Sequence, residues 1–130
     1  MYSFKTCLEG DIGVIEDRVV AALKGEGFGV MTEIDVQATM KAKLGIEKRP
    51  YRILGACNPS LANQAIEAEP DIGLLLPCNV VIRQEEDGSV TVAFMDPVAV
   101  LQLVEGPKIA EMAIDVRQRL ERVRDAIEAA

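Results

Sequence analysis

Two stretches of alternating apolar and polar residues, joined by a short acidic turn, constrain the fold of this chain more than any other feature. The stretches NVVIRQE (79–85) and SVTVAFM (89–95) flank a turn that contains Asp87 and Gly88. Alternation with a period of two is typical of a strand with one buried face. An Asp-Gly pair supplies the positive φ angles that tight hairpin turns require. The sequence therefore predicts an antiparallel β-hairpin.

The other elements are predicted from periodicity and from residues that start or stop helices. Asp11, Asp35 and Asn58 each stand where a helix N-cap belongs, ahead of apolar residues at helical spacing. Glycines after two of these stripes predict helix ends. Further strands are predicted from Tyr2 to Leu8, Phe28 to Ile34 and Tyr51 to Cys57, and helices from Asp11 to the Gly25 and Gly27 pair, Asp35 to Gly45, Asn58 to Pro70, and after Gly106-Pro107.

The order of these elements predicts an α+β fold. A strand and a helix precede four strands with short helical inserts, and a long helix ends the chain. An antiparallel sheet with helices packed on one side is the simplest arrangement that buries every apolar stripe. A length of 130 residues predicts a single domain, residues 1–130. With 49% hydrophobic residues, a core can form without metals or disulfides.

The charge balance argues against two classes of partner. Fourteen basic and twenty-one acidic residues give a net charge of −7, which repels nucleic acid and anionic membrane surfaces. Aromatic residues make up only 4%, too few for base-stacking platforms. We therefore expect neither a nucleic-acid partner nor a membrane partner.

The cysteine count indicates a compartment. Acidic residues such as Glu9, Asp11 and Glu16 interrupt the region where a signal peptide needs an apolar run. Three cysteines, an odd number without a secretion signal, favour a reducing environment. We expect a cytoplasmic protein.

The absence of histidine removes much of the chemical repertoire. Neither a Ser-His nor a Cys-His nucleophilic pair can form, and no zinc site can contain histidine. Gly25, Gly27 and Gly29 alternate at the end of a predicted helix, which favours a helix stop over a phosphate-binding loop.

Two cysteines share a local pattern, in LGACNPS (54–60) and LLPCNVV (75–81). Cys57 directly precedes the Asn58-Pro59 helix start, where the helix dipole favours an anion by about 0.3–1 kcal/mol. One pKa unit is about 1.4 kcal/mol, so the dipole alone activates this thiol only mildly. Cys78 follows Pro77 in an apolar run and is typical of a small buried hydrophobe. Simple packing, a shared ligand or metal site, and redox or nucleophilic use all remain open for this pair.

Two acidic residues stand in unusual settings. Glu33 lies in the apolar strand segment VMTEID, where burying it unpaired is costly. It either faces solvent, pairs with Arg49 or Arg52, or completes a site with the cysteines. Asp96, before Pro97, is interpreted as a turn residue.

The segments GFGVMTEIDV and YRILGACNPSLANQAIEAEPDIGLLLPCNVVI, with an Asp-Pro pair after the last strand, resemble a bacterial and archaeal family known as domain of unknown function 302. The resemblance implies a TATA-binding-protein-like fold of β-α-β(4)-α order and a symmetric dimer. It implies no activity. Its recurrent positions correspond here to Gly27, Phe28, Glu33, Asp35, Cys57, Asn58, Pro59, Pro77 and Cys78.

Together these observations predict a homodimeric, non-enzymatic module that binds a small ligand or a soft metal. The predicted ligand-binding residues are Glu33, Cys57, Asn58 and Cys78, with Cys57 and Cys78 as the metal ligands. The sequence does not identify a cofactor. One alternative is a thiol-dependent redox protein or enzyme that uses Cys57 as its nucleophile. Another is an interaction protein that acts through its dimer surface.

Overall fold

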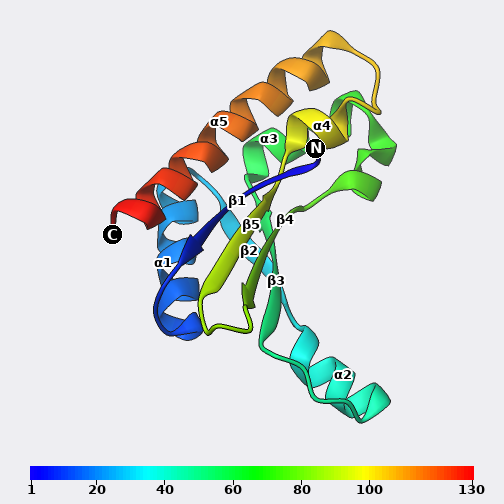
Figure 1. Ribbon diagram of the computed structural model, residues 1–130. Coiled ribbons are helices and arrows are strands. Elements are labelled where there is room, and N and C mark those ends of the chain that lie inside the picture. Colours follow the sequence, from blue (N-terminus) through cyan, green and yellow to red (C-terminus); the bar gives the residue numbers. More distant parts are fainter.

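Five strands form one antiparallel sheet, and helices cover one of its faces (Figure 1). The computed structural model describes all residues, 1–130. The strands lie in the order β1-β5-β4-β3-β2. The predicted α+β class, with helices on one side of an antiparallel sheet, is confirmed. The strands are β1 (Ser3–Leu8), β2 (Gly29–Asp35), β3 (Tyr51–Cys57), β4 (Cys78–Gln84) and β5 (Val90–Met95); the helices are α1 (Ile12–Gly25), α2 (Val36–Leu44), α3 (Pro59–Ala68), the 3₁₀ helix η1 (Pro70–Leu75), α4 (Pro97–Leu101) and α5 (Pro107–Ala129).

The predicted hairpin joins β4 to β5, but its turn differs from the expectation. Of the two turn residues only Gly88 has a positive φ, of 90°. The Asp87 carboxylate accepts hydrogen bonds from the Ser89 backbone N–H (2.9 Å) and hydroxyl (2.6 Å). The prediction that Asp87 shares the positive φ is therefore wrong, because its side chain forms the local turn instead.

The main core lies between the covered face of the sheet and the helices α1 and α5. Alternate residues of the strands point to this face and meet the apolar stripes predicted for the two helices. We call this group the core cluster. Its buried members are Ile15, Val19, Leu23, Phe28, Leu54, Ala56, Cys78, Val80, Ile82, Val90, Val92, Phe94, Val116, Leu120, Val123 and Ile127.

The outer face of α5 is charged, as its sequence predicts. Ion pairs four residues apart stabilise such exposed helix faces modestly. The pairs along α5 are Asp115–Arg119 (3.4 Å), Arg117–Glu121 (3.2 Å) and Arg124–Glu128 (3.6 Å).

None of the helices combines the length and the apolarity needed to cross a membrane.

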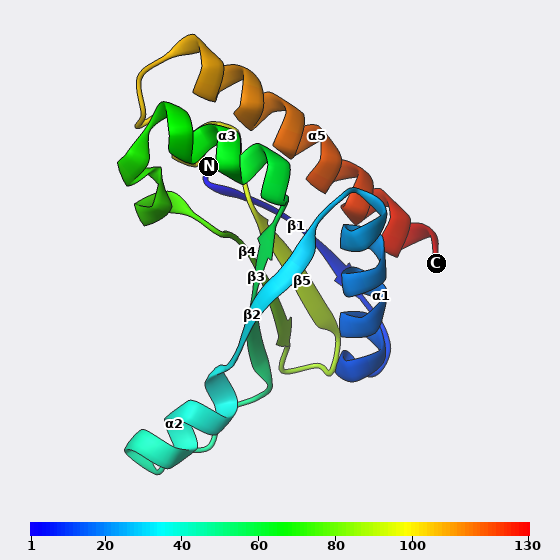
Figure 2. The same cartoon turned by 180° about the vertical axis from the view of Figure 1, so that it is seen from behind.

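A second, smaller group of buried side chains lies at one end of the sheet. It joins α3, η1 and α4 to the first turns of α5, and we call these elements together the cap (Figure 2). Neither η1 nor α4 was predicted from the sequence. The cap cluster consists of Ala65, Ile72, Leu101, Ile109, Met112 and Ala113.

Asp96 starts the unpredicted helix α4. Its Oδ1 atom accepts hydrogen bonds from the backbone N–H groups of Val98 (2.9 Å) and Ala99 (3.5 Å). Its Oδ2 atom lies 3.2 Å from Nη1 of Arg117 on α5. The interpretation of Asp96 as a turn residue is therefore wrong. This buried carboxylate is an N-cap and an ion-pair partner, and it fixes α4 against α5.

The second face of the sheet has no helix over its centre. The strand registers align Ile34 with Ile53, Ile53 with Val81, and Val81 with Ala93. These four side chains form one apolar row across four strands, and Lys5 pairs with Ala93 at its end. We call this surface the open face.

The stability of the fold should depend on the absence of a side chain at Gly55. A Cβ atom at this position would meet the Thr32 hydroxyl and would lie 2.8 Å from Cγ of Pro77. We expect Gly55→Ala to lower the free energy of unfolding by about 1–3 kcal/mol, as overpacking does. Gly29→Ala is the matched control, because a Cβ there meets nothing within 4 Å. Chemical denaturation measures both, and equal stabilities would contradict the close approach of Pro77 to β3.

Candidate functional site

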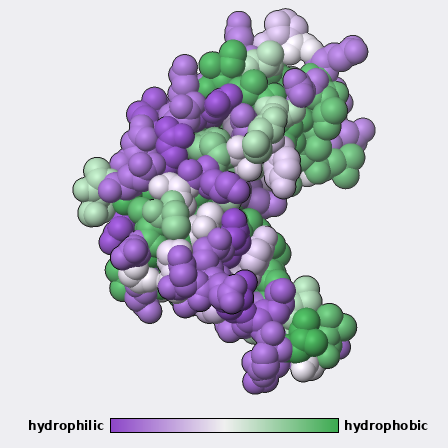
Figure 3. Space-filling view, viewed as in Figure 1, coloured by the Kyte–Doolittle hydropathy of each residue, from purple (hydrophilic) through white to green (hydrophobic).

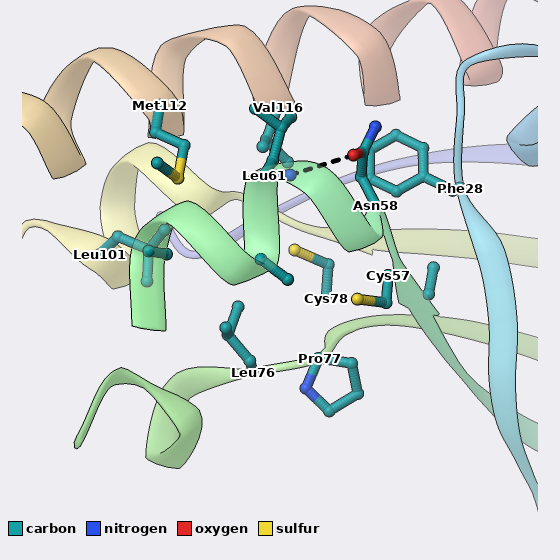
Figure 4. A pocket seen from close by; sticks show the side chains of 13 residues that line it. Phe28, Cys57, Asn58, Leu61, Leu76, Pro77, Cys78, Leu101, Met112 and Val116 are labelled. Carbon is teal, nitrogen blue, oxygen red and sulfur yellow. Dashed lines mark hydrogen bonds between the residues drawn. The ribbon is translucent and has the colours of Figure 1, made fainter. Parts of the chain in front are cut away.

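An apolar pocket lies at the seam between the core cluster and the cap cluster (Figure 4). Its unfilled volume is about 40 Å³, and 11 of its 13 lining residues are hydrophobic. The core cluster, the cap cluster and partly buried residues between them all contribute to its wall. The lining consists of Phe28, Ala56, Cys57, Asn58, Leu61, Ala62, Ala65, Leu76, Pro77, Cys78, Leu101, Met112 and Val116.

The pairing of β3 with β4 brings both cysteines of the repeated pattern to this pocket. Ala56 on β3 pairs with Cys78 on β4, so Cys57 is the next residue along from the partner of Cys78. Cys78 is buried, whereas Cys57 is half-buried at the end of β3. Figure 4 shows both sulfur atoms directed to the same side, into the space beneath α3. The sequence places the two thiols far apart, and the fold places them on one wall.

Burial suppresses ionisation of both thiols. It raises the pKa of Cys78 from 9.0 to about 11, with a smaller contribution from the neighbouring Cys57. Burial also raises the pKa of Cys57. Both groups are therefore protonated at neutral pH. Since the thiolate is the nucleophile and the metal ligand, this environment gives neither cysteine the character of an activated residue.

Asn58 lines the pocket, but its side chain already has a structural partner. Its Oδ1 atom accepts a hydrogen bond from the backbone N–H of Leu61 (3.2 Å), which makes it the N-cap of α3 as predicted. The positive φ of Gly27 (86°) ends α1 next to it, and a Cβ on Gly27 would lie 2.8 Å from the Asn58 amide nitrogen. Asn58 therefore positions α3 over the pocket.

Glu33 lies away from the pocket, on the exposed part of β2. A hydrogen bond to Glu16, followed by burial and the Glu16 charge, raises its pKa, while Arg52 acts in the opposite direction. Arg52 forms its ion pair with Glu16, at 3.1 Å. The structure therefore does not bring Glu33 together with Cys57 and Cys78.

The donor set near the cysteines is short for a metal centre. No group of three or more His, Cys, Asp or Glu side chains is placed to hold a metal ion. Besides the two thiols, the pocket wall offers only the Met112 thioether as a soft donor. No Asp, Glu, Lys or Arg side chain belongs to the lining.

Sequence reasoning did not identify the apolar residues that form most of the pocket wall. Leu61 and Ala65 on α3, and Met112 and Val116 on α5, follow the helical spacing of core residues. Such stripes predict burial but not which stripes leave a gap between them. Only the position of the cap relative to the sheet shows the gap.

The family model described as "Domain of unknown function DUF302" matches residues 4–127. The chain belongs to this family. The DUF302 fold is also seen in a solved structure, the crystal structure of an uncharacterized conserved protein DUF302 from Bacillus stearothermophilus, with a TM-score of 0.88 and 28% sequence identity over 97% of this chain and 98% of that chain.

A curated relative covers less of the chain. An uncharacterized protein of Aquifex aeolicus (strain VF5) is 29% identical over 75 residues, which is 58% of this chain. The match spans 46% of that relative, so this DUF302 chain aligns with about half of its length.

The order of thiol accessibility gives one prediction. Cys7 is exposed, Cys57 is half-buried and Cys78 is buried. With iodoacetamide at about pH 8 we expect alkylation of Cys7 first, Cys57 more slowly, and Cys78 only when the protein opens. Mass spectrometry of digested samples measures the three rates. A Cys57 rate above that of Cys7 would contradict the protonated state and would favour the redox alternative.

The raised pKa of Cys78 gives a second prediction. Unfolded Cys78 loses its proton above about pH 9, whereas the folded protein keeps it to about pH 11. The folded state thus binds more protons in this window, and stability should fall as the pH rises, by up to about 1.4 kcal/mol per pH unit. Below pH 9 the contribution is fully present. Denaturation across this range should show a smaller slope for Cys78→Ala, and an unchanged slope would contradict the prediction.

Proposed function

We propose that this DUF302 domain is a non-enzymatic module that binds a small apolar molecule, or the apolar end of a larger one, in the seam pocket. The observation that carries the proposal is the unfilled apolar volume of about 40 Å³ beside two thiols. A water molecule needs roughly 10–15 Å³ of such volume and two to four polar partners. The pocket has the room but few polar groups, which favours an apolar occupant.

The energetics of the empty seam support binding. A ligand that fills the pocket removes both the apolar wall and its own apolar surface from water, which is worth roughly 25 cal/mol per Å². A charged ligand group would be buried without a partner, since no charged residue belongs to the lining.

The position of the pocket gives a ligand a route of entry. One wall is α3, which has Ala65 as its only buried residue and is joined to β4 through η1 and the Leu76-Pro77 segment. Leu74 on η1 is 87% exposed. Because this part of the cap buries few side chains, moving it enlarges the pocket at less cost than moving α1 or α5, which pack on the sheet.

Soft-metal binding is the weaker version of the prediction. It would require the loss of a proton from Cys78, whose pKa is raised to about 11. It would also rest on two thiols and a thioether without a carboxylate. The uncharged pocket therefore favours an apolar ligand over a metal ion.

The proposal includes a cytoplasmic homodimer. All three cysteines are free, which fits a reducing compartment. The apolar row on the open face, with Ile34 48% exposed, is the kind of surface that a second subunit covers.

Ligand binding can be tested with simple apolar probes. We expect 1-butanol and 1-hexanol to shift the amide NMR signals of pocket residues such as Leu61 and Cys78. Ala62→Leu should abolish these shifts without unfolding the protein, because it fills the pocket from α3. Ala68→Leu, at an exposed position on the same helix, is the matched control.

Two outcomes would contradict this proposal. Equal shifts in Ala62→Leu and the native protein would place the alcohols elsewhere. Retention of one Cu(I) per chain after dialysis, lost in Cys57→Ser and Cys78→Ser, would establish the soft-metal version instead.

A further inference from the structure

The segment between β2 and β3 is an arm without a core of its own. It comprises α2 and the loop to β3, residues 36–50, and Figure 1 shows it projecting beyond the end of the sheet. No residue between Phe28 and Leu54 is buried. The nine residues of α2 bury none of their side chains. Helices shorter than about 12 residues are marginal in water without tertiary packing.

The arm nevertheless carries apolar side chains. Leu44 is 65% exposed and Ile46 is 44% exposed, and Met40 lies one turn before Leu44. Figure 3 shows an apolar surface at the tip of the arm, bordered by hydrophilic residues. An apolar surface on a projecting helix is typical of an element that packs against another molecule.

The charge of the arm identifies the kind of surface it fits. Lys41, Lys43, Lys48 and Arg49 outnumber its one acid, Glu47, whereas the whole chain has a net charge of −7. Lys41 pairs with Glu47 at 3.0 Å, which leaves Lys43 and Lys48 without an ion pair. The arm therefore fits a surface that is acidic and also has exposed apolar side chains. Because the rest of this chain is acidic, a second copy of the chain can provide such a surface.

The cap carries such a surface at the opposite end of the molecule. A shallow depression of about 360 Å³ between η1 and the α4–α5 loop is lined by Glu69, Asp71, Ile72, Leu103, Val104 and Glu105. Its three carboxylates form no ion pair within the chain, and Leu103 is 76% exposed.

We propose that the arm of one protomer docks into this cap depression of a second copy; the inference rests on the proposed homodimer and adds its interface. Figures 1 and 2 show α2 and η1 at opposite ends of the sheet and on the side away from α1. A two-fold axis perpendicular to the long direction of the molecule brings each arm to the other protomer's depression. The same operation turns the two open faces, with their apolar rows, toward each other.

In this arrangement each dimer has two identical arm contacts and one contact between open faces. A stable interface buries roughly 800 Å² per partner, and all three contacts contribute to that area. Ile34 belongs to the open face and only Asp35 separates it from the arm, so the two surfaces lie close together along the chain.

The first experiment measures mass by sedimentation equilibrium across dilution. We expect the native chain to be a dimer and Leu44→Glu/Ile46→Glu to raise the dissociation constant by about 100-fold or more. Val14→Glu is the matched control, an apolar residue 57% exposed on α1, and should leave the dimer intact. Circular dichroism checks that each variant is folded. A monomeric native chain would overturn both the homodimer and the arm contact, whereas a variant that stays dimeric would overturn only the arm contact.

The second experiment tests which surface receives the arm. Lys43→Glu/Lys48→Glu and Glu69→Lys/Glu105→Lys should each weaken the homodimer by about 10-fold or more, because like charges then face each other. An equimolar mixture should form the heterodimer in preference to either homodimer, since both contacts regain opposite charges. Native mass spectrometry counts the three species. A statistical 1:2:1 mixture would overturn the cap depression as the receiving surface. Alcohol binding by the monomeric arm variant separates this result from the ligand proposal.

Discussion

The antiparallel pairing of β3 with β4 is the constraint on which the rest of this structure depends. It sets Ala56 against Cys78 and so brings the two cysteine patterns to one end of the sheet. The chain between these strands must leave the sheet at Cys57 and return to it at Cys78. It does so through α3 and η1, whose apolar residues then need α4 and α5 to cover them. The cap, the seam and the thiol pair all follow from that one register.

The seam is where two separately packed groups of side chains meet. The sheet, α1 and most of α5 pack closely, since much of the core cluster is less than 2% exposed. The cap cluster is smaller and is built on short helices, whose ends are fixed by polar contacts such as those of Asn58 and Asp96. Two separately packed groups of side chains leave space where they meet, and Cys57 and Cys78 line that space.

Local chemistry in the sequence was sufficient to predict most of the fold. Alternation predicted the strands, and the capping residues Asp11, Asp35 and Asn58 marked helix starts that the structure confirms. The helix α4 was missed although Asp96-Pro97 has the same cap-then-proline signature as Asn58-Pro59, because only five residues follow it in the helix. Glu33 shows a different limit. A register shift between Val30 and Thr32 changes which face each later residue of β2 occupies, and no sequence pattern announces it. The shift places Glu33 opposite Leu54, on the face where it meets Glu16 of α1. Its distance from the cysteines has another cause: Gly29 is the residue that pairs with Cys57, and Glu33 lies four residues further along β2.

The central claim is that the seam beside Cys57 and Cys78 is an apolar space able to hold an apolar guest. The most direct measurement is a crystal structure of the protein under pressurised xenon, which occupies dry apolar cavities and avoids polar ones. The account predicts one xenon atom within the wall formed by Leu61, Cys78 and Met112. Ordered, hydrogen-bonded water in that space, with xenon only elsewhere or absent, would contradict it.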